Sequence, residues 1–271
     1  FKRFRGDQDI AIEDLTVGQM KDFQSYLIGE GLRMNTISLY NRELRAVYNY
    51  ALDEEIIQMD KRPFRKSFTG QEKTRKRAVD GGVVKRLAIL SLIDKEMLGF
   101  ARDLFLFSIY MQGMPFIDMA YLKKEQVRNG CITYQRRKTN RQLRVKIHPQ
   151  AQIIIDRYMV SDPGCPYLFP ILYDPEKKTE WEYSSALRVY NKRLDSLSSL
   201  LELDEPLTSY VARHTWASLA RQCGTSDTVI SEAMGHSHVG VTTIYLASLD
   251  IGMVAMANQR VITSLFRKRI P

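Results

Sequence analysis

Cysteine is scarce in this sequence, and long apolar runs are missing. The three cysteines, Cys131, Cys165 and Cys223, lie far apart and form no Cys-x-x-Cys pair. This spacing argues against a disulfide framework and against a zinc finger, and it fits a reducing compartment. No apolar run approaches the ~18 residues that a membrane span needs. The chain begins with Phe1 rather than Met and shows no signal-peptide pattern, so we expect a fragment of a longer cytoplasmic protein.

Acidic residues are also in deficit. The 271 residues include 40 Lys and Arg against 31 Asp and Glu, which gives a formal net charge of +9. This excess favours a polyanionic partner. Hydrophobic residues make up 44% of the chain, a fraction that excludes wholesale disorder. A chain of this length forms one large domain or two modest ones.

The first 60 residues have the apolar spacing of a small helical domain. Thr16 is a predicted N-cap, and Gly29 and Gly31 are expected to end the helix that follows. The next helix is expected to use Asn35 or Thr36 as its cap. Two apolar faces recur at helical spacing, formed by Met20, Phe23, Tyr26 and Leu27 and by Ile37, Tyr40, Leu44, Val47, Tyr48 and Leu52.

Residues 61–78 form a predicted basic linker. Residues 61–77 include eight Lys or Arg and one acidic residue, and Pro63 and Gly70 interrupt regular structure. Such a run is commonly a solvated linker, whereas in a basic protein it also suits contact with a phosphate backbone. The residues expected to make that contact are Lys61, Arg62, Arg65, Lys66, Lys73, Arg75, Lys76 and Arg77.

A second, larger domain is expected from residue 79 onward. The apolar run at 102–111 predicts a helix at its centre. Residues 126–147 alternate with a period of two around an Asn129–Gly130 turn, and the segment RRKTNR forms a basic hairpin tip between two strands. Helical spacing predicts further helices at 81–92, 150–159, 184–201, 209–222, 226–234 and 238–248.

Four features of this domain have side chains that suit catalysis or phosphate binding. Arg213 carries a planar, permanently charged fork that suits phosphate, although an Arg-His pair by itself is more often structural. His236 and His238 occupy a turn with no Cys or carboxylate at useful spacing, so we do not expect zinc. Tyr245, one of 14 tyrosines, follows nine residues after His236. Lys138 at the hairpin tip could contact phosphate or donate a proton to a leaving oxygen.

The order of these features resembles the tyrosine recombinase, or phage integrase, family. The resemblance rests on RHTWASLA…MGHSHVGVTTIY and on GMPFIDMAYLKKEQV, and it is strongest for integrases of bacterial conjugative and other mobile elements. It implies a two-domain, C-shaped clamp that is mainly α with a small antiparallel β-sheet. A helical, SAM-like core-binding domain would span 1–60 and the linker 61–78. A catalytic domain would span 79–271, with a segment at 254–271 that docks on a neighbouring protomer.

The resemblance also implies a role for each of the four features. Tyr245 would attack a DNA phosphodiester, forming a 3′-phosphotyrosyl bond and releasing a 5′-hydroxyl, a reaction that requires no ATP, metal or other cofactor. Arg213 would hold the nonbridging oxygens of the phosphate. His236 would hydrogen-bond the same phosphate, and Lys138 would be the general acid for the 5′-oxygen.

Four further positions follow from the family pattern. Asp118 takes its acidic position and is expected to orient neighbouring groups, while His214 is expected to support the Arg213 turn from beneath. Two positions depart from the pattern. Tyr210 occupies the place of the usual histidine of the second motif, and Gln112 occupies the place of the first arginine. Losing one phosphate clamp costs about 10²–10³-fold in rate.

Three explanations for Gln112 stay open at this stage. Another basic residue of the hairpin, Arg136, Arg137 or Arg144, could take over in a natural lineage. The glutamine could be an engineered change that slows cleavage. The protein could also have lost catalysis and kept DNA binding.

We therefore expect a site-specific DNA recombinase that integrates and excises a mobile element. The alternatives are a catalytically impaired, recombinase-derived DNA-binding protein and a type IB topoisomerase. The expected partners are double-stranded DNA, a homo-tetramer on two DNA sites and accessory DNA-bending proteins, in the bacterial cytoplasm at the nucleoid. We also expect that an N-terminal arm-binding domain is left out. The hairpin would add Arg136, Arg137 and Arg141 to the DNA-binding set.

Overall fold

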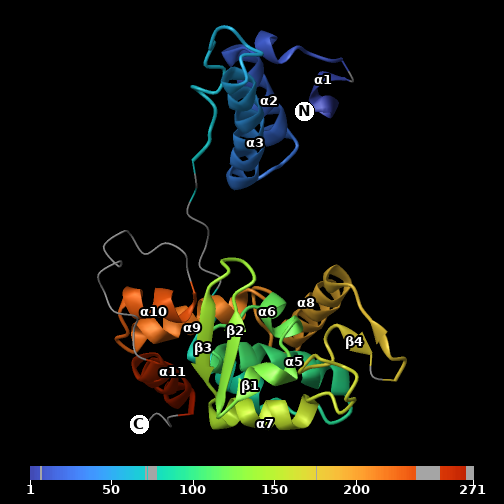
Figure 1. Ribbon diagram of the computed structural model, residues 1–271, viewed down its shortest axis with the longest axis vertical. Helices are drawn as coiled ribbons and strands as arrows, with labels where there is room; N and C mark the ends of the chain where they lie inside the picture. Colours follow the sequence, from blue (N-terminus) through green and yellow to red (C-terminus); the bar gives the residue numbers. More distant parts are fainter. Residues whose placement is uncertain (7, 71, 73–77, 175, 236–250, 267–271) are drawn as a thin grey trace. The chain divides into compact units, whose positions relative to one another are not determined.

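The computed structural model describes residues 1–6, 8–70, 72, 78–174, 176–235 and 251–266. The chain divides into two compact units, Phe1–Arg75 and Lys76–Pro271. In the described residues most elements are helices, joined by small antiparallel sheets (Figure 1). The predicted fold class, mainly α with a small antiparallel sheet, is confirmed.

The first unit is built on two packed helices. They are α2 (Val17–Gly29) and α3 (Met34–Asp53), preceded by α1 (Lys2–Arg5) and the 3₁₀ turn η1 (Ile12–Asp14). Helix α2 starts as predicted, because the Thr16 side chain accepts from the backbone N–H of Gln19 while the Gln19 side chain accepts from that of Thr16. The core between the helices contains Met20, Phe23, Leu27, Ile37 and Tyr48.

The predicted cap of α3 is wrong. Arg33 occupies the N-cap position and makes no side-chain capping bond. The Asn35 side chain instead hydrogen-bonds the backbone of Glu72, accepting from its N–H at 2.8 Å and donating to its carbonyl at 3.0 Å. A residue that looked like a local cap therefore ties α3 to a segment 37 positions away.

Much of the expected linker belongs to the first unit. Phe64 is buried against Tyr48, and Asn41 donates to the carbonyl of Phe68 at 3.0 Å. The Ser38 hydroxyl donates to the carbonyl of Gly70 at 2.6 Å. These apolar and polar anchors hold part of the segment 61–70 on the helices, and contact of the basic linker 61–78 with a phosphate backbone stays a prediction.

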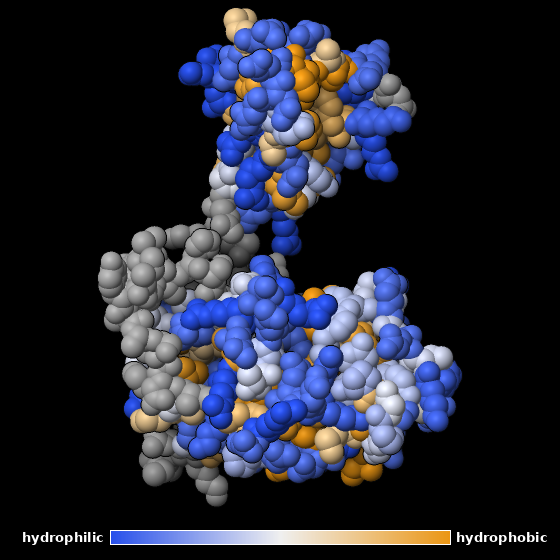
Figure 2. Space-filling view, in the orientation of Figure 1, coloured by the Kyte–Doolittle hydropathy of each residue, from blue (hydrophilic) through white to orange (hydrophobic). Residues whose placement is uncertain are grey.

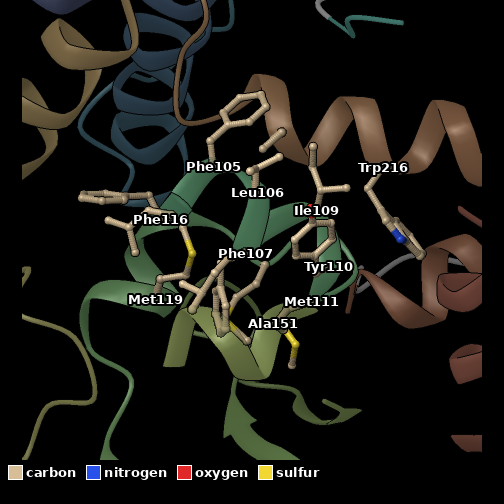
Figure 3. Close-up of a cluster of buried hydrophobic side chains, with 14 of the residues drawn as sticks. Phe105, Leu106, Phe107, Ile109, Tyr110, Met111, Phe116, Met119, Ala151 and Trp216 are labelled. Atoms are coloured by element: carbon tan, nitrogen blue, oxygen red, sulfur yellow. The ribbon is translucent and has the colours of Figure 1, made fainter. Parts of the chain in front are cut away.

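The second unit is organised around one buried helix. Ten residues of α5 (Glu96–Tyr110) are buried, and four other helices pack against it. Figure 3 shows its aromatic and aliphatic side chains, with Trp216 contributed by α9. The surrounding helices are α4 (Gly81–Ile89), α7 (Pro149–Tyr158), α8 (Tyr183–Leu200) and α9 (Val211–Gln222). All the helices predicted in the described part of this unit are present, with shifted ends.

Two antiparallel sheets lie in the described part of this unit. The predicted sheet has the order β1-β2-β3, and Ile132 faces Val145 across its central pair. A second, two-stranded sheet was not predicted, because its strands of two residues are too short to show alternation. The strands are β1 (Val127–Arg128), β2 (Cys131–Gln135), β3 (Gln142–Lys146), β4 (Tyr173–Asp174) and β5 (Thr179–Glu180). Short helical elements lie at α6 (Phe116–Ala120), η2 (Lys124–Gln126) and α10 (Asp227–Ala233).

The last helix packs on its own unit. In α11 (Ile251–Phe266), buried Asn258 accepts from Trp216 Nε1 at 3.0 Å and donates to the carbonyl of Tyr110 at 2.5 Å. Most apolar residues of α11 are thus buried in the core of their own unit, and docking of 254–271 on a neighbouring protomer stays a prediction. Residues 267–271 and the helix expected at 238–248 lie outside the described residues. No described helix is both long and apolar enough to cross a membrane.

Candidate active site

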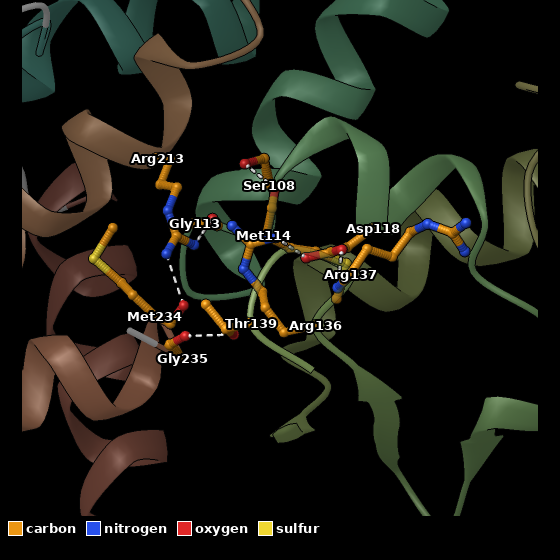
Figure 4. A network of polar contacts seen from close by, with 10 residues as sticks. All are labelled: Ser108, Gly113, Met114, Asp118, Arg136, Arg137, Thr139, Arg213, Met234 and Gly235. Carbon is orange, nitrogen blue, oxygen red and sulfur yellow. Dashed lines mark hydrogen bonds and ion pairs between the residues drawn. The ribbon is translucent and has the colours of Figure 1, made fainter. Parts of the chain in front are cut away.

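Arg213 is buried and held by two backbone carbonyls. Its side chain is 2% exposed and donates from Nη1 to the carbonyl of Gly113 at 2.9 Å and from Nη2 to that of Met234 at 2.7 Å (Figure 4). The first carbonyl follows α5 and the second ends α10, so three helices fix one guanidinium. Burial and, after it, the nearby Arg136 guanidinium lower the pKa of Arg213 to about 10. The group remains a cation at neutral pH.

The turn after α5 requires glycine at position 113. Gly113 has a φ of 72°, and a Cβ there would lie 3.2 Å from the Cα of Arg213. The backbone N–H groups of Gly113 and Met114 donate to the Ser108 carbonyl, and the Ser108 hydroxyl donates to the Met114 carbonyl. These bonds fix the turn so that its carbonyl reaches Arg213.

Gln112 adjoins this turn, but its side-chain amide makes its hydrogen bond outside the turn. The residue is 4% exposed and has a φ of 62°. Its Nε2 donates to the carbonyl of Val254 in α11, at 3.5 Å. The position expected to hold an arginine is therefore filled by a neutral side chain that contacts the last helix.

The β2–β3 hairpin is tied to the end of α10. The Thr139 hydroxyl donates to the carbonyl of Gly235 at 2.9 Å, and Arg141 forms an ion pair with Glu232. Gly235 has a φ of 65°, and a Cβ there would lie 2.9 Å from the side chain of Leu143. Lys138 is exposed at the tip, beside the bond that fixes the hairpin to the residue preceding His236.

Asp118 holds the start of the hairpin tip, directly after β2. Its carboxylate accepts from Arg136 Nη1 at 2.7 Å and from the backbone N–H of Arg137 at 3.0 Å. Burial raises the pKa of Asp118, while these two donors act in the opposite direction. The Arg137 guanidinium lies 3.7 Å from the centre of the Tyr121 ring, so it is a surface group stacked on an aromatic.

Tyr210 and His214 form an exposed pair at the start of α9. Tyr210 is 44% exposed, and its ring centre lies 4.9 Å from that of His214. His214 was expected to support the Arg213 turn from beneath; it lies on the exposed side of α9, and that role stays a prediction. The helical period explains this result, since residues 213 and 214 point about 100° apart.

In the first unit, the predicted DNA-binding residues that the structure describes are exposed but not equivalent. Lys61 donates from Nζ to the carbonyl of Glu13 at 2.7 Å, and Arg62 lies 3.7 Å from Asp60. Figure 2 shows hydrophilic side chains over both units, including the end of the second unit where the hairpin projects. Arg65 and Lys66 are exposed as well. The predicted residues that lie outside the described part of the chain are Lys73, Arg75, Lys76, Arg77, His236 and Tyr245.

Sequence reasoning missed the residues that position the site. Ser108, Gly113 and Thr139 act through turn geometry and single hydrogen bonds, for which the sequence carries no pattern. Arg136 was named as a candidate together with Arg137 and Arg144, and its burial had a signal, because it continues the inward alternation of Ile132 and Tyr134 beyond β2. Within the described residues, no group of three or more His, Cys, Asp or Glu could hold a metal ion.

Comparisons with known proteins agree with this geometry. The model of the phage integrase SAM-like domain matches residues 1–68, and that of the phage integrase family matches residues 85–250. No curated protein matches the sequence.

Several solved structures share the fold. A lambda integrase dimer bound to a COC′ core site has 15% identity and a TM-score of 0.65, over 90% of this chain and 84% of that chain. The Tn1549 transposon integrase in complex with circular intermediate DNA has 13% identity and a TM-score of 0.64, over 95% and 90%. The integrase from mycobacterium phage Brujita has 16% identity and a TM-score of 0.53, over 96% and 82%. The family models cover both units of the chain, which therefore belongs to the phage integrase family of tyrosine recombinases.

Proposed function

We propose that this chain is a site-specific DNA recombinase that cuts and rejoins strands through a 3′-phosphotyrosyl intermediate. The observation that carries the proposal is the fixed arrangement around Arg213. A buried cation is held by the carbonyls of Gly113 and Met234, and the basic hairpin is tied to Gly235 beside it. Such a preorganised positive site suits the charge that develops on a phosphoryl group in the transition state.

The proposed reaction is a transesterification. The Tyr245 oxygen forms a bond to the phosphorus of the scissile phosphodiester, and the bond from phosphorus to the 5′-oxygen breaks. Lys138 gives the departing oxygen its proton, while the proton of the tyrosine hydroxyl passes to solvent. Arg213 and His236 bind the nonbridging oxygens. In the second step a 5′-hydroxyl from another strand attacks the phosphotyrosine, which restores Tyr245 and rejoins the DNA without a further energy source.

The proposed partners follow from charge and from the family. Exposed basic groups such as Arg62, Arg65 and Lys66 suit the phosphate backbone, which fixes register without reading sequence. Recombination requires two DNA sites, so we propose a tetramer. One lambda integrase with this fold, 16% identical and with a TM-score of 0.66, is a tetramer bound to a Holliday junction. The substrate would be the ends of a mobile element in the bacterial cytoplasm, where accessory DNA-bending proteins could assist.

A nicked suicide substrate tests this proposal. Duplexes are first selected from a random-sequence pool by binding to the chain. They are then nicked close to each candidate cleavage position, so that the short fragment released with a 5′-hydroxyl diffuses away. We expect a protein–DNA adduct that survives denaturation and disappears in Tyr245→Phe. Tight binding without an adduct would contradict recombination and favour a DNA-binding protein. Relaxation of supercoiled plasmid that lacks a selected site would favour a topoisomerase.

A further inference from the structure

One buried cation of the site has no part in the mechanism above. Arg136 is 4% exposed, and its Nη1 pairs with Asp118 Oδ2 at 2.7 Å, with both side chains almost fully covered. Its Nε is buried and has no hydrogen-bond partner. A guanidinium donor removed from water without a replacement acceptor is costly, so this atom needs an explanation. A hydrogen-bond acceptor on the bound substrate would explain the unpartnered Nε.

The position of Arg136 indicates what that acceptor is. Figure 4 shows its guanidinium between Asp118 and the guanidinium of Arg213. The two arginines are close enough that Arg136 is the second largest influence on the Arg213 pKa after burial, and it lowers that pKa. A pair of neighbouring buried cations with one carboxylate leaves a net positive charge, which is suited to an anion with several oxygens.

The other two hairpin candidates are placed differently. Arg137 stacks on the Tyr121 ring, and Arg144 is exposed in β3. Gln112 contacts Val254 and cannot contribute charge. Of the three arginines considered for the missing clamp, only Arg136 is buried beside Arg213.

We propose that Arg136 supplies the second guanidinium contact to the scissile phosphate, replacing the arginine that the family has at position 112. This proposal rests on the proposed recombinase function. Asp118 holds Nη1 and orients the fork, so that the unpartnered Nε–H can donate to a nonbridging phosphate oxygen. In this chain the second clamp is therefore carried by the β2–β3 hairpin, whose tip also carries Lys138. Binding of the phosphate would then fix the general acid and one clamp through the same element.

The first test compares adduct formation by variants on the suicide substrate. Arg136→Gln should lower the rate at saturating DNA by about 10²-fold or more, the loss typical of one preorganised donor. The matched control is Arg128→Gln, on the same sheet at the end away from the hairpin tip, and it should stay within about threefold of the parent chain. The double variant Asp118→Asn/Arg136→Gln removes both members of the buried pair, so it does not leave an orphaned carboxylate. It should show the same loss while remaining folded by circular dichroism.

A second substrate separates phosphate contact from a structural role. In a methylphosphonate linkage a methyl group replaces one nonbridging oxygen, so the reacting group is neutral and needs less cationic stabilisation. The loss caused by Arg136→Gln should shrink at least about tenfold on this substrate. An equal loss on both substrates, or a rate for Arg136→Gln within about threefold of the parent, would overturn the role of Arg136. If the parent chain forms no Tyr245-dependent adduct on either substrate, the recombinase proposal itself fails.

Discussion

At the scale of single residues, position 112 is neutral and position 136 holds the cation beside Arg213. Gln112 adopts a φ of 62° and is buried against α11, while Arg136 lies buried beside Arg213. The cation of the second clamp has a place in the site, although it comes from a different element than the sequence motif requires. A second arginine at 112 would therefore add charge to a site that already has its two cations.

Gln112→Arg should accordingly raise the rate of adduct formation by less than about tenfold. The larger, charged side chain must fit beside Val254 in a buried position, so the free energy of unfolding should fall by about 1–3 kcal/mol. Single-turnover kinetics and urea unfolding measure the two effects. A gain of about 10²-fold or more would show that the site lacks a cation and would argue against Arg136.

Asn258 is the residue that anchors helix α11 to the core of the second unit. Asn258→Ala leaves the indole N–H of Trp216 and the carbonyl of Tyr110 without their buried partner. The loss of two such bonds should lower the free energy of unfolding by about 2–4 kcal/mol. Urea unfolding monitored by tryptophan fluorescence measures it, with exposed Arg260→Ala as the control. A change below about 1 kcal/mol would show that α11 is held by its apolar contacts alone.

Among the elements, α7 has a cap that depends on pH. His148 is its N-cap, and its Nδ1 accepts from the backbone N–H of Gln150 at 3.2 Å. Burial lowers the pKa of His148 in the folded state, against a smaller opposing effect from Gln259. The neutral form is therefore the one that stabilises the fold. Its contribution is present above the unfolded pKa of about 6.5 and is lost as pH falls through the lower folded value.

Replacing this cap by Asn should remove the pH dependence without removing the cap. Asn accepts the same hydrogen bond and does not titrate. Between pH 7 and 5 the parent chain should lose about 1 kcal/mol more stability than His148→Asn, the usual value of one helix cap. Thermal unfolding at a series of pH values measures the difference. Parallel pH profiles for the two proteins would contradict the role of His148.

The elements also show how far sequence patterns reach. Helix α2 was predicted with its cap, because Thr16 and Gln19 interact three positions apart. The cap of α3 was not, since Asn35 bonds to Glu72 across a loop. The central helix, the hairpin and Arg213 followed from periodicity and motif. The choice between Arg136, Arg137 and Arg144 depended on which face of the hairpin is buried, and the location of α11 depended on Asn258. Contacts distant in sequence decide such questions, and no local pattern reports them.

At the scale of the molecule, the net charge of +9 should make DNA binding strongly dependent on salt concentration. The logarithm of the association constant should fall linearly with the logarithm of salt concentration, with a slope of about 0.9 for each neutralised phosphate. Arg65→Gln, at an exposed position, should reduce the slope by about 0.9. Lys61→Gln should reduce it less, because the Lys61 ammonium is bonded to the Glu13 carbonyl. Fluorescence anisotropy over a salt series measures both, and a flat salt response would contradict a phosphate-binding surface.

The central claim concerns a covalent bond between Tyr245 and the 3′-phosphate at the break in a DNA strand. Its most direct measurement uses a suicide duplex labelled at either end of the scissile strand, followed by protease digestion and mass spectrometry of the adduct. The account predicts that only the label 5′ to the break stays on the protein, on the peptide that contains Tyr245, and that the other fragment carries a 5′-hydroxyl. Retention of the opposite label, or attachment to a residue other than Tyr245, would contradict it.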